Sequence, residues 1–264
     1  MFNVSRLSKF VLPVLLISLM MSSVNAQQNT TADELLTCAQ QNLNSENFHG
    51  VIKVDTFRPE FSRSFLLEIW STADNENALV RILEPLDEEG SGYLLIGEDE
   101  LLFFTPLAGQ AISLPRAALS ESLFGSDVAV EDLYRGTLNE RYVPELLGTR
   151  NDDNGDFVHR LRLTPKPDAD VVFGKLEIDM QDSNCAVLSI DYFDQRDTLV
   201  RQGIFEDFVE RGGLVFAQRS VVTDLLRQNS FTEQTVQSFE VGIEFPETLF
   251  TVDCLEDETQ CGLP

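Results

Sequence analysis

Short segments with the two-residue alternation of β-strands, separated by turns, fill most of this chain from residue 50 onward. In residues 175–180, for example, Leu176, Ile178 and Met180 share one face of such a strand and charged residues occupy the other. The separators are turn formers, as at 74–77 and 97–99. Connections this short predict antiparallel pairing, and the absence of a strand–helix–strand rhythm disfavours a doubly wound parallel sheet.

About ten or eleven strands are expected, and a sheet with this many strands must curl or split. Residues 78–83 and 101–105 are apolar on both faces, so these strands need cover on both sides. A first helix opens at Thr31, where Glu34 completes a capping box, and ends near 44–47. Residues 115–147 break the strand rhythm with short helical turns at 116–123 and 128–133 and one more within 138–147. We predict a single α+β domain, mostly antiparallel β, over residues 27–264.

The first 26 residues have the features of a secretory signal peptide. Arg6 and Lys9 precede an apolar run at 10–21, and small residues end at Ala26. A membrane anchor is the alternative, but the run is shorter than the roughly 20 residues that span a bilayer. No later stretch of the sequence is long and apolar enough to span one. We therefore expect a soluble, exported protein.

The charge of the chain limits its partners. It contains 44 acidic and 19 basic residues, a net charge of −25, and loss of Arg6 and Lys9 with the signal peptide makes it −27. This excess of acid argues against a nucleic-acid partner, because phosphate backbones require clustered Lys and Arg. It also argues against electrostatic docking to anionic lipid head groups. Solubility is the simplest explanation of the charge, and a partner with a basic face is the alternative.

Four cysteines follow the signal peptide: Cys38, Cys185, Cys254 and Cys261. Export permits disulfides, and four cysteines allow three pairings. Because six residues separate Cys254 from Cys261, we predict a local disulfide there, which leaves Cys38 to pair with Cys185. A metal site is the alternative, but it would require closely spaced Cys or His pairs that this sequence lacks.

A succession of motifs between residues 80 and 133 is more specific than the strand pattern. It contains an Arg-bearing strand ending in Pro at 80–85, a Gly-Ser-Gly turn at 90–92, an aromatic strand followed by Pro and Gly at 103–109, Gly-Ser-Asp at 125–127, and Asp-Leu at 132–133. This succession resembles the LolA-like family of outer-membrane lipoprotein-sorting proteins. Weaker matches at 163–166, 191–194 and 245–247 extend the resemblance over about 31–252. The chain departs from the family pattern at Val128, where an aromatic residue is usual, and at 101–104, where a Trp is usual.

The resemblance implies a curved, unclosed half-barrel of antiparallel strands, with a few short helices as a lid over an apolar cavity. It also implies a periplasmic carrier of lipoprotein acyl chains or another lipid, often beside membrane exporters. An acyl chain needs an apolar lining, since each CH₂ removed from water contributes about 0.8 kcal/mol. The candidate lining residues are Phe65, Leu67, Ile69, Trp70, Arg81, Tyr93, Phe103 and Phe104.

Each of these assignments has a structural alternative. The aromatic side chains could simply fill a core. Gly125, Ser126 and Asp127 either form a loop at the cavity mouth or cap a helical turn. Arg81, a charge on an apolar strand, either faces the polar head of a ligand or pairs with an acid such as Asp127 or Asp132.

Recognisable catalytic motifs are missing from the sequence. His49 and His159 lie at or within predicted strands, where a structural role suffices. There is no nucleophile elbow, His-Glu-x-x-His or P-loop, and the acidic clusters at 87–89 and 152–153 lack the spacing of a calcium loop. We therefore expect that the protein is not an enzyme and that it binds no cofactor and no metal. The first hypothesis is a non-catalytic carrier of a hydrophobic ligand. The alternative is a protein-interaction or sensor module accessory to an envelope export system.

Overall fold

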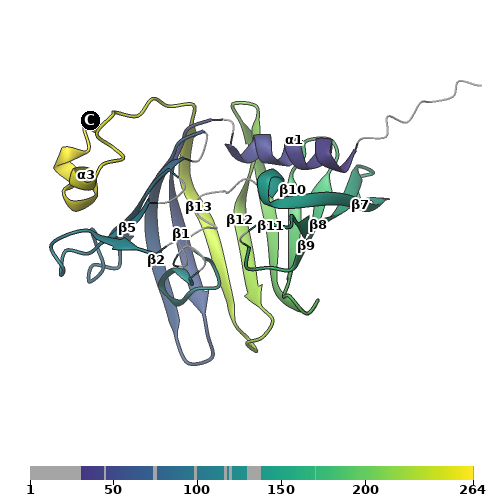
Figure 1. Ribbon diagram of the computed structural model, residues 1–264, viewed down its shortest axis with the longest axis horizontal. Coiled ribbons are helices and arrows are strands. Elements are labelled where there is room, and N and C mark those ends of the chain that lie inside the picture. The colour runs from purple at the N-terminus through teal and green to yellow at the C-terminus, as the bar shows by residue number, and fades with distance from the viewer. Residues whose placement is uncertain are drawn as a thin grey trace, which may run out of the picture.

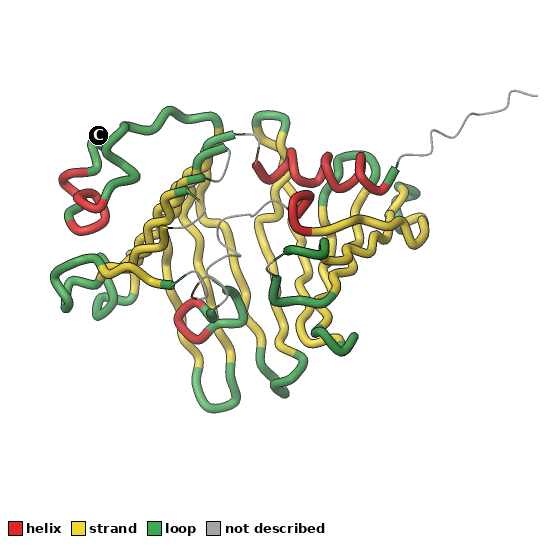
Figure 2. The backbone as a smooth tube through the Cα atoms, in the orientation of Figure 1, coloured by secondary structure: helices red, strands yellow, loops and turns green. Residues whose placement is uncertain are grey.

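One large antiparallel sheet dominates the computed structural model, which describes residues 31–44, 46–73, 76–97, 100–115, 118, 121–129, 138–169 and 171–263. The predicted signal peptide lies outside these residues. The described part of the chain contains thirteen strands in the order β6-β5-β4-β3-β2-β1-β13-β12-β11-β10-β9-β8-β7. The sheet is strongly curved and remains open, because its two edge strands, β6 and β7, do not pair with each other (Figures 1 and 2).

The strands follow the chain with mostly short connections. They are β1 (Phe48–Phe57), β2 (Ser62–Ser71), β3 (Asn77–Glu84), β4 (Gly92–Ile96), β5 (Glu100–Phe104), β6 (Ile112–Leu114), β7 (Tyr142–Asn151), β8 (Phe157–Pro165), β9 (Lys175–Gln181), β10 (Val187–Phe193), β11 (Leu199–Arg211), β12 (Leu214–Asp224) and β13 (Phe231–Val241). The helices are α1 (Ala32–Asn44), η2 (Leu123–Gly125), α2 (Leu138–Arg141), α3 (Val252–Glu256) and η4 (Glu258–Gln260).

The sheet has two faces with different cover, and we call the face that contacts α1 and η2 the inner face. A continuous row of cross-strand neighbours crosses it through Ile190, Gly203, Val222, Thr232 and Thr56. At one end of this row, an apolar cluster of β7 to β10 packs against α1. At the other end, an apolar cluster of β1 to β5 packs against η2. Both clusters therefore belong to one concave surface.

Helix α1 begins with a capping box, and its apolar stripe and a disulfide hold it on the inner face. The predicted capping box is confirmed: the Glu34 amide donates to Thr31 Oγ1 (3.2 Å) and the Thr31 amide donates to Glu34 Oε2 (2.8 Å). Leu35 and Leu36 are buried against the sheet. The predicted Cys38–Cys185 disulfide is present, with Cα atoms 5.8 Å apart. The bond joins α1 to the connection between β9 and β10.

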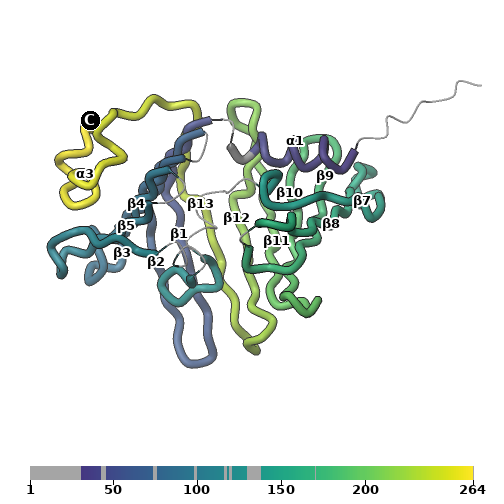
Figure 3. Tube along the Cα trace, in the orientation of Figure 1, coloured from purple at the N-terminus to yellow at the C-terminus, as the bar shows by residue number. Residues whose placement is uncertain are grey.

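The outer face is covered by the C-terminal segment, 245–261, over β2 to β5. Its Leu249, Leu255 and the Cys254–Cys261 disulfide are buried there, and the two Cα atoms of this second predicted disulfide are 4.5 Å apart. Strands β3 and β5 are thus buried on both faces, as their composition predicted. Figure 3 shows this segment on the outside of the sheet, away from α1.

Elsewhere the outer face is charged. Arg160 forms ion pairs with Glu177 (2.9 Å), Asp179 (3.0 Å) and Asp191 (2.7 Å) on neighbouring strands. Partial burial acts to raise the pKa of Glu177, but hydrogen bonds from Arg160 and Arg162 outweigh it, so this pKa lies below its ordinary value. These pairs occupy positions that alternate with the apolar side chains beneath α1.

The structure corrects the sequence-based expectations in two places. The count of ten or eleven strands was too low, and the largest omission is β7, which begins directly after α2, the helical turn expected within 138–147. β7 is an edge strand whose side chains are mostly exposed on both faces, so its sequence shows no two-residue alternation. The second omission is the C-terminal pair α3 and η4. The turn expected at 128–133 lies largely outside the described residues.

Candidate ligand-binding face

The apolar half of the inner face is built from alternate residues of β2 and its neighbours. Phe65, Leu67 and Ile69 project to this side, and each is buried. Their cross-strand partners on β1, including Val54 opposite Phe65, continue the same surface. The result is a concave apolar surface without a charged side chain among its buried residues.

The segment 122–127, which we call the plug, covers this surface. Leu123 is fully buried in the apolar cluster. The ring of Phe124 stacks on Phe65 (centroids 4.6 Å apart) and lies 5.8 Å from Tyr93. Phe124 has φ +50°, a left-handed conformation that costs a bulky residue of order 1–3 kcal/mol. The plug therefore places Leu123 and Phe124 on the sheet even though the backbone conformation of Phe124 is unfavourable.

Three polar side chains, which we call the latch, hold the plug in position: Arg58, Asp127 and Thr232. Arg58 contacts both carboxylate oxygens of Asp127 at 2.8 Å, and its Nη2 also donates to the Gly125 carbonyl at 3.1 Å. Thr232 donates its hydroxyl to Asp127 Oδ2 (3.0 Å) and accepts from the Asp127 amide (2.9 Å). The side chains of Arg58 and Asp127 are only 5% and 1% exposed. Charge-assisted contacts in a buried setting are the stronger class of hydrogen bond.

A cavity of about 230 Å³ lies between the plug and the adjoining ends of β11 and β12. Its walls combine apolar and polar side chains: Ser122, Ser126, Asp127, Val128, Ala129, Val200, Arg201, Asp224, Leu226 and Arg227. Arg201 lies over the ring of Tyr192, 3.9 Å from its centroid, and donates to the Asp127 carbonyl at 3.3 Å. The predicted loop at the cavity mouth, Gly125-Ser126-Asp127, thus contributes two of its three residues to a cavity wall. The Asp127 side chain contacts Arg58 and Thr232, and the Ser126 hydroxyl accepts from the Val128 amide (3.1 Å).

The eight predicted lining residues divide between the two faces. Phe65, Leu67, Ile69, Tyr93 and Phe103 lie on the inner face, where burial raises the pKa of Tyr93 and nearby Glu121 and Glu88 raise it further. Trp70, Arg81 and Phe104 lie on the opposite, outer face under the C-terminal segment. These three cannot share one lining with the other five, so their inclusion in a single cavity was wrong. Two-residue alternation by itself separates Trp70 from Phe65 within β2 and Phe104 from Phe103 within β5, whereas the placement of Arg81 follows only from the pairing of β3 with β2.

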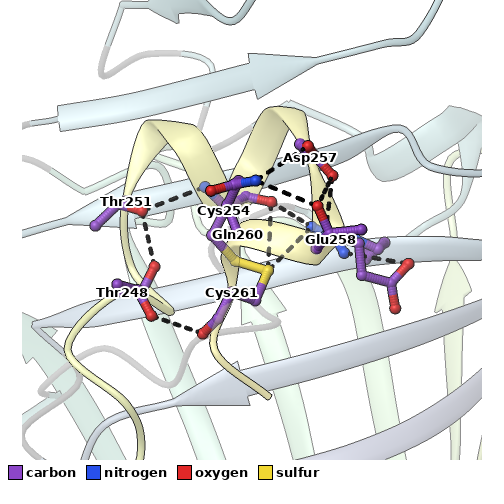
Figure 4. Close-up of a disulfide and its surroundings, with 9 residues drawn as sticks. Thr248, Thr251, Cys254, Asp257, Glu258, Gln260 and Cys261 are labelled. Carbon is purple, nitrogen blue, oxygen red and sulfur yellow. Dashed lines mark hydrogen bonds and ion pairs between the residues drawn. A yellow bond between two sulfur atoms is a disulfide. The ribbon is translucent and has the colours of Figure 1, made fainter. Parts of the chain in front are cut away.

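Arg81 is bound by the C-terminal segment. Its Nη2 donates to the Cys254 carbonyl at 2.7 Å and its Nη1 lies 3.6 Å from Glu258 Oε2. Of the two alternatives for Arg81, the structure thus shows pairing with an acid, but this acid is Glu258; Asp127 pairs with Arg58, and Asp132 lies outside the described residues. Burial lowers the pKa of this guanidinium, and Glu258 partly offsets the effect. Figure 4 shows the surrounding turn, in which Thr248 donates to the Cys261 carbonyl (2.9 Å) and Thr251 caps α3 at the Cys254 amide (3.2 Å).

Comparison with known proteins agrees with this geometry. A family model described as "uncharacterized protein" matches residues 74–257, which is well over half of the chain. A LolA superfamily protein from Nitrosomonas europaea is 25% identical, with a TM-score of 0.72 over 84% of this chain and 98% of its own. The chain belongs to the LolA-like family.

Two further solved structures share the LolA-like fold. A DUF1329 family protein from Desulfovibrio piger is 20% identical, with a TM-score of 0.77 over 85% of this chain and 97% of its own. A putative outer-membrane lipoprotein-sorting protein domain from Vibrio parahaemolyticus is 18% identical, with a TM-score of 0.73 over 85% and 99%. No curated protein matches the chain. Among the described helices of this LolA-like protein, none has the length and apolar character to cross a membrane.

Sequence reasoning missed the residues that hold the plug of this LolA-like protein. Arg58 precedes Pro59, a pair typical of a turn, and Thr232 lies in a polar stretch of a strand, so neither residue type signals a binding role. Phe124 directly precedes the Gly-Ser-Asp motif, and this adjacency was the available signal for its role. Arg58 and Asp127 are 69 residues apart, so only the fold brings them together.

Proposed function

We propose that this protein carries a hydrophobic ligand, lipoprotein acyl chains or another lipid, through the periplasm on the inner face of its sheet. The observation that supports the proposal is the combination of a concave apolar surface with a plug held by polar contacts. No covalent chemistry and no cofactor are part of this proposal. Both disulfides and the LolA-like fold are consistent with an envelope location.

The proposed exchange replaces plug side chains with ligand. An acyl chain that enters between the plug and β2 would make the contacts that Leu123 and Phe124 now make with Phe65. Each CH₂ group so covered contributes about 0.8 kcal/mol to the free energy of binding. Release of Phe124 from its left-handed backbone conformation makes a further favourable contribution. Helix α1, fixed by the Cys38–Cys185 disulfide, stays in place, so the plug is the part that moves.

Lipid analysis of the purified protein tests the proposal. Native mass spectrometry of protein isolated from an envelope fraction should detect bound lipid, and the delipidated protein should take up a fluorescent acyl probe. If neither is observed, the carrier function is refuted. Phe124→Ala should raise the affinity for the probe, because less side chain has to be displaced from Phe65. Phe104→Ala is the control, since it truncates a buried phenylalanine that lies on the outer face.

A protein-interaction or sensor module is the second candidate, and an acidic surface favours it. Residues 240–258 contain seven acidic residues and no Lys or Arg. An envelope exporter component with a basic face is the class of partner that this charge would suit. Capture of such a component that weakens with salt, together with no uptake of the acyl probe, would favour this function over the carrier.

A further inference from the structure

Two adjacent turns at one end of the sheet expose four large apolar side chains. Phe57 (37% exposed) and Phe61 (50%) belong to the turn between β1 and β2. Leu225 (46%) and Leu226 (71%) belong to the turn between β12 and β13. Phe57 is paired with Phe231 across β1 and β13, and their rings stack at 4.6 Å, so the two turns lie side by side. We call these four residues the apolar tip; both turns are at the bottom of Figure 3.

The apolar tip is continuous with the candidate ligand-binding face. Leu226 is part of the cavity wall that the plug closes from the other side. Arg58 of the latch lies in the tip itself, between Phe57 and Phe61, and its amide donates to the Phe61 carbonyl at 2.9 Å. A membrane or ligand bound at the tip therefore lies next to the cavity wall and next to Arg58, the residue that holds Asp127.

The two turns themselves carry balanced charge: with their flanks they hold two basic residues, Arg58 and Arg227, and two acidic ones, Glu60 and Asp224. The neighbouring β3–β4 turn adds three acids, Asp87, Glu88 and Glu89, and Glu88 forms an ion pair with Arg63 (2.7 Å). The seven acidic residues at 240–258 begin at the other end of β13, a full strand away. Because the Debye length is about 8 Å at physiological ionic strength, these distant acids contribute little at the tip. The overall negative charge disfavours attraction to anionic head groups but does not oppose an apolar contact at this end.

We propose that the apolar tip inserts into the interfacial region of a lipid bilayer and so places the cavity mouth at the membrane surface. The inference rests on the proposed function, because a lipid carrier must reach the bilayer or a protein within it. Aromatic and leucine side chains on the ends of turns are suited to insertion among head groups. A stable protein interface would require a broader surface, on the order of 800 Å² per partner.

Cosedimentation with phosphatidylcholine vesicles tests the inference with an uncharged membrane. The wild-type protein should cosediment, and binding should change little with added salt. The double variant Phe61→Ser/Leu225→Ser should bind at least about tenfold more weakly, since both substitutions remove apolar area from the tip and neither residue lines the cavity. Leu107→Ser is the matched control, because Leu107 is 97% exposed in the turn between β5 and β6 and should leave binding unchanged.

Three results would overturn the inference: no cosedimentation of the wild type, equal binding of the tip variant, or binding that appears only with anionic phosphatidylglycerol and disappears with salt. Circular dichroism should show the tip variant folded, since the side chains of Phe61 and Leu225 are both exposed. Uptake of the acyl probe without vesicles separates this inference from the proposed function. A tip variant that keeps probe uptake and loses vesicle binding supports the docking role, whereas a wild type that binds vesicles without probe uptake refutes the carrier alone.

Discussion

Replacing Asp127 by Asn should destabilise the protein by about 3 kcal/mol, because it leaves a buried guanidinium without its counter-charge. The substitution preserves shape and one carbonyl acceptor but removes the carboxylate that Arg58 contacts at 2.8 Å through both of its terminal nitrogens. Breaking a buried ion pair on one side costs about 3–5 kcal/mol. Arg58 keeps two carbonyl acceptors, those of Phe57 and Gly125, which places the expected cost at the lower end of this range.

Urea unfolding of four proteins would measure this cost: wild type, Asp127→Asn, Arg58→Met, and the double variant. The double variant removes both charges, so its loss of unfolding free energy should be smaller than the sum of the single losses. Glu60→Gln is the control, since Glu60 is an exposed acid in the same turn as Arg58. The two single latch variants should also take up the acyl probe faster, because their plug is held by fewer contacts.

The latch argument is refuted if Asp127→Asn stays within about 0.5 kcal/mol of the wild type, the usual range for surface substitutions. It is equally refuted if the effects of the two single substitutions simply add, because additivity means that the two side chains do not interact. If stability falls as expected but the uptake rates do not change, the ion pair is confirmed and its role in holding the plug is refuted.

Three further predictions address the core, the disulfide cover and the response to acid. Leu67→Ala, at a fully buried inner-face position, should cost about 2–5 kcal/mol in urea unfolding, and a loss below 1 kcal/mol would contradict the core assignment. Removing the C-terminal disulfide with Cys254→Ser/Cys261→Ser should lower the free energy of unfolding by about 2–3 kcal/mol. It should also shift the fluorescence emission of Trp70, the only Trp, to longer wavelength, because Trp70 lies under the C-terminal segment. Unchanged emission would show that this segment does not cover Trp70. The pKa of Glu177 is lowered in the folded state, so its contribution to stability is present above its ordinary pKa of 4.5 and is lost as pH falls through the folded value. Glu177→Gln should therefore lose less stability than the wild type on acidification below about pH 4.5, and parallel curves would disprove this origin.

Much of the fold was predictable because strand patterning is local. The strand predicted at 175–180 is β9 to within one residue, and the capping box of α1 formed as expected. Both disulfide pairings could be predicted because the two nearby cysteines left a single pairing for the others. β7 was missed for the opposite reason: an exposed edge strand needs no apolar face, so its sequence carries no periodic signal.

The sequence by itself determined which side chains share a face within one strand. Two-residue alternation groups Phe65, Leu67 and Ile69 whatever surrounds them, because it follows from backbone geometry. Only the tertiary structure decided which face is the inner one, and it placed Arg81 of β3 on the face opposite to that group. The physical reason is that burial depends on what packs against a face. The cover over Trp70 and Arg81 arrives from residues 245–261, and the plug over the other face is held by partners on two different strand ends, so neither contact is encoded in the spacing of neighbouring residues.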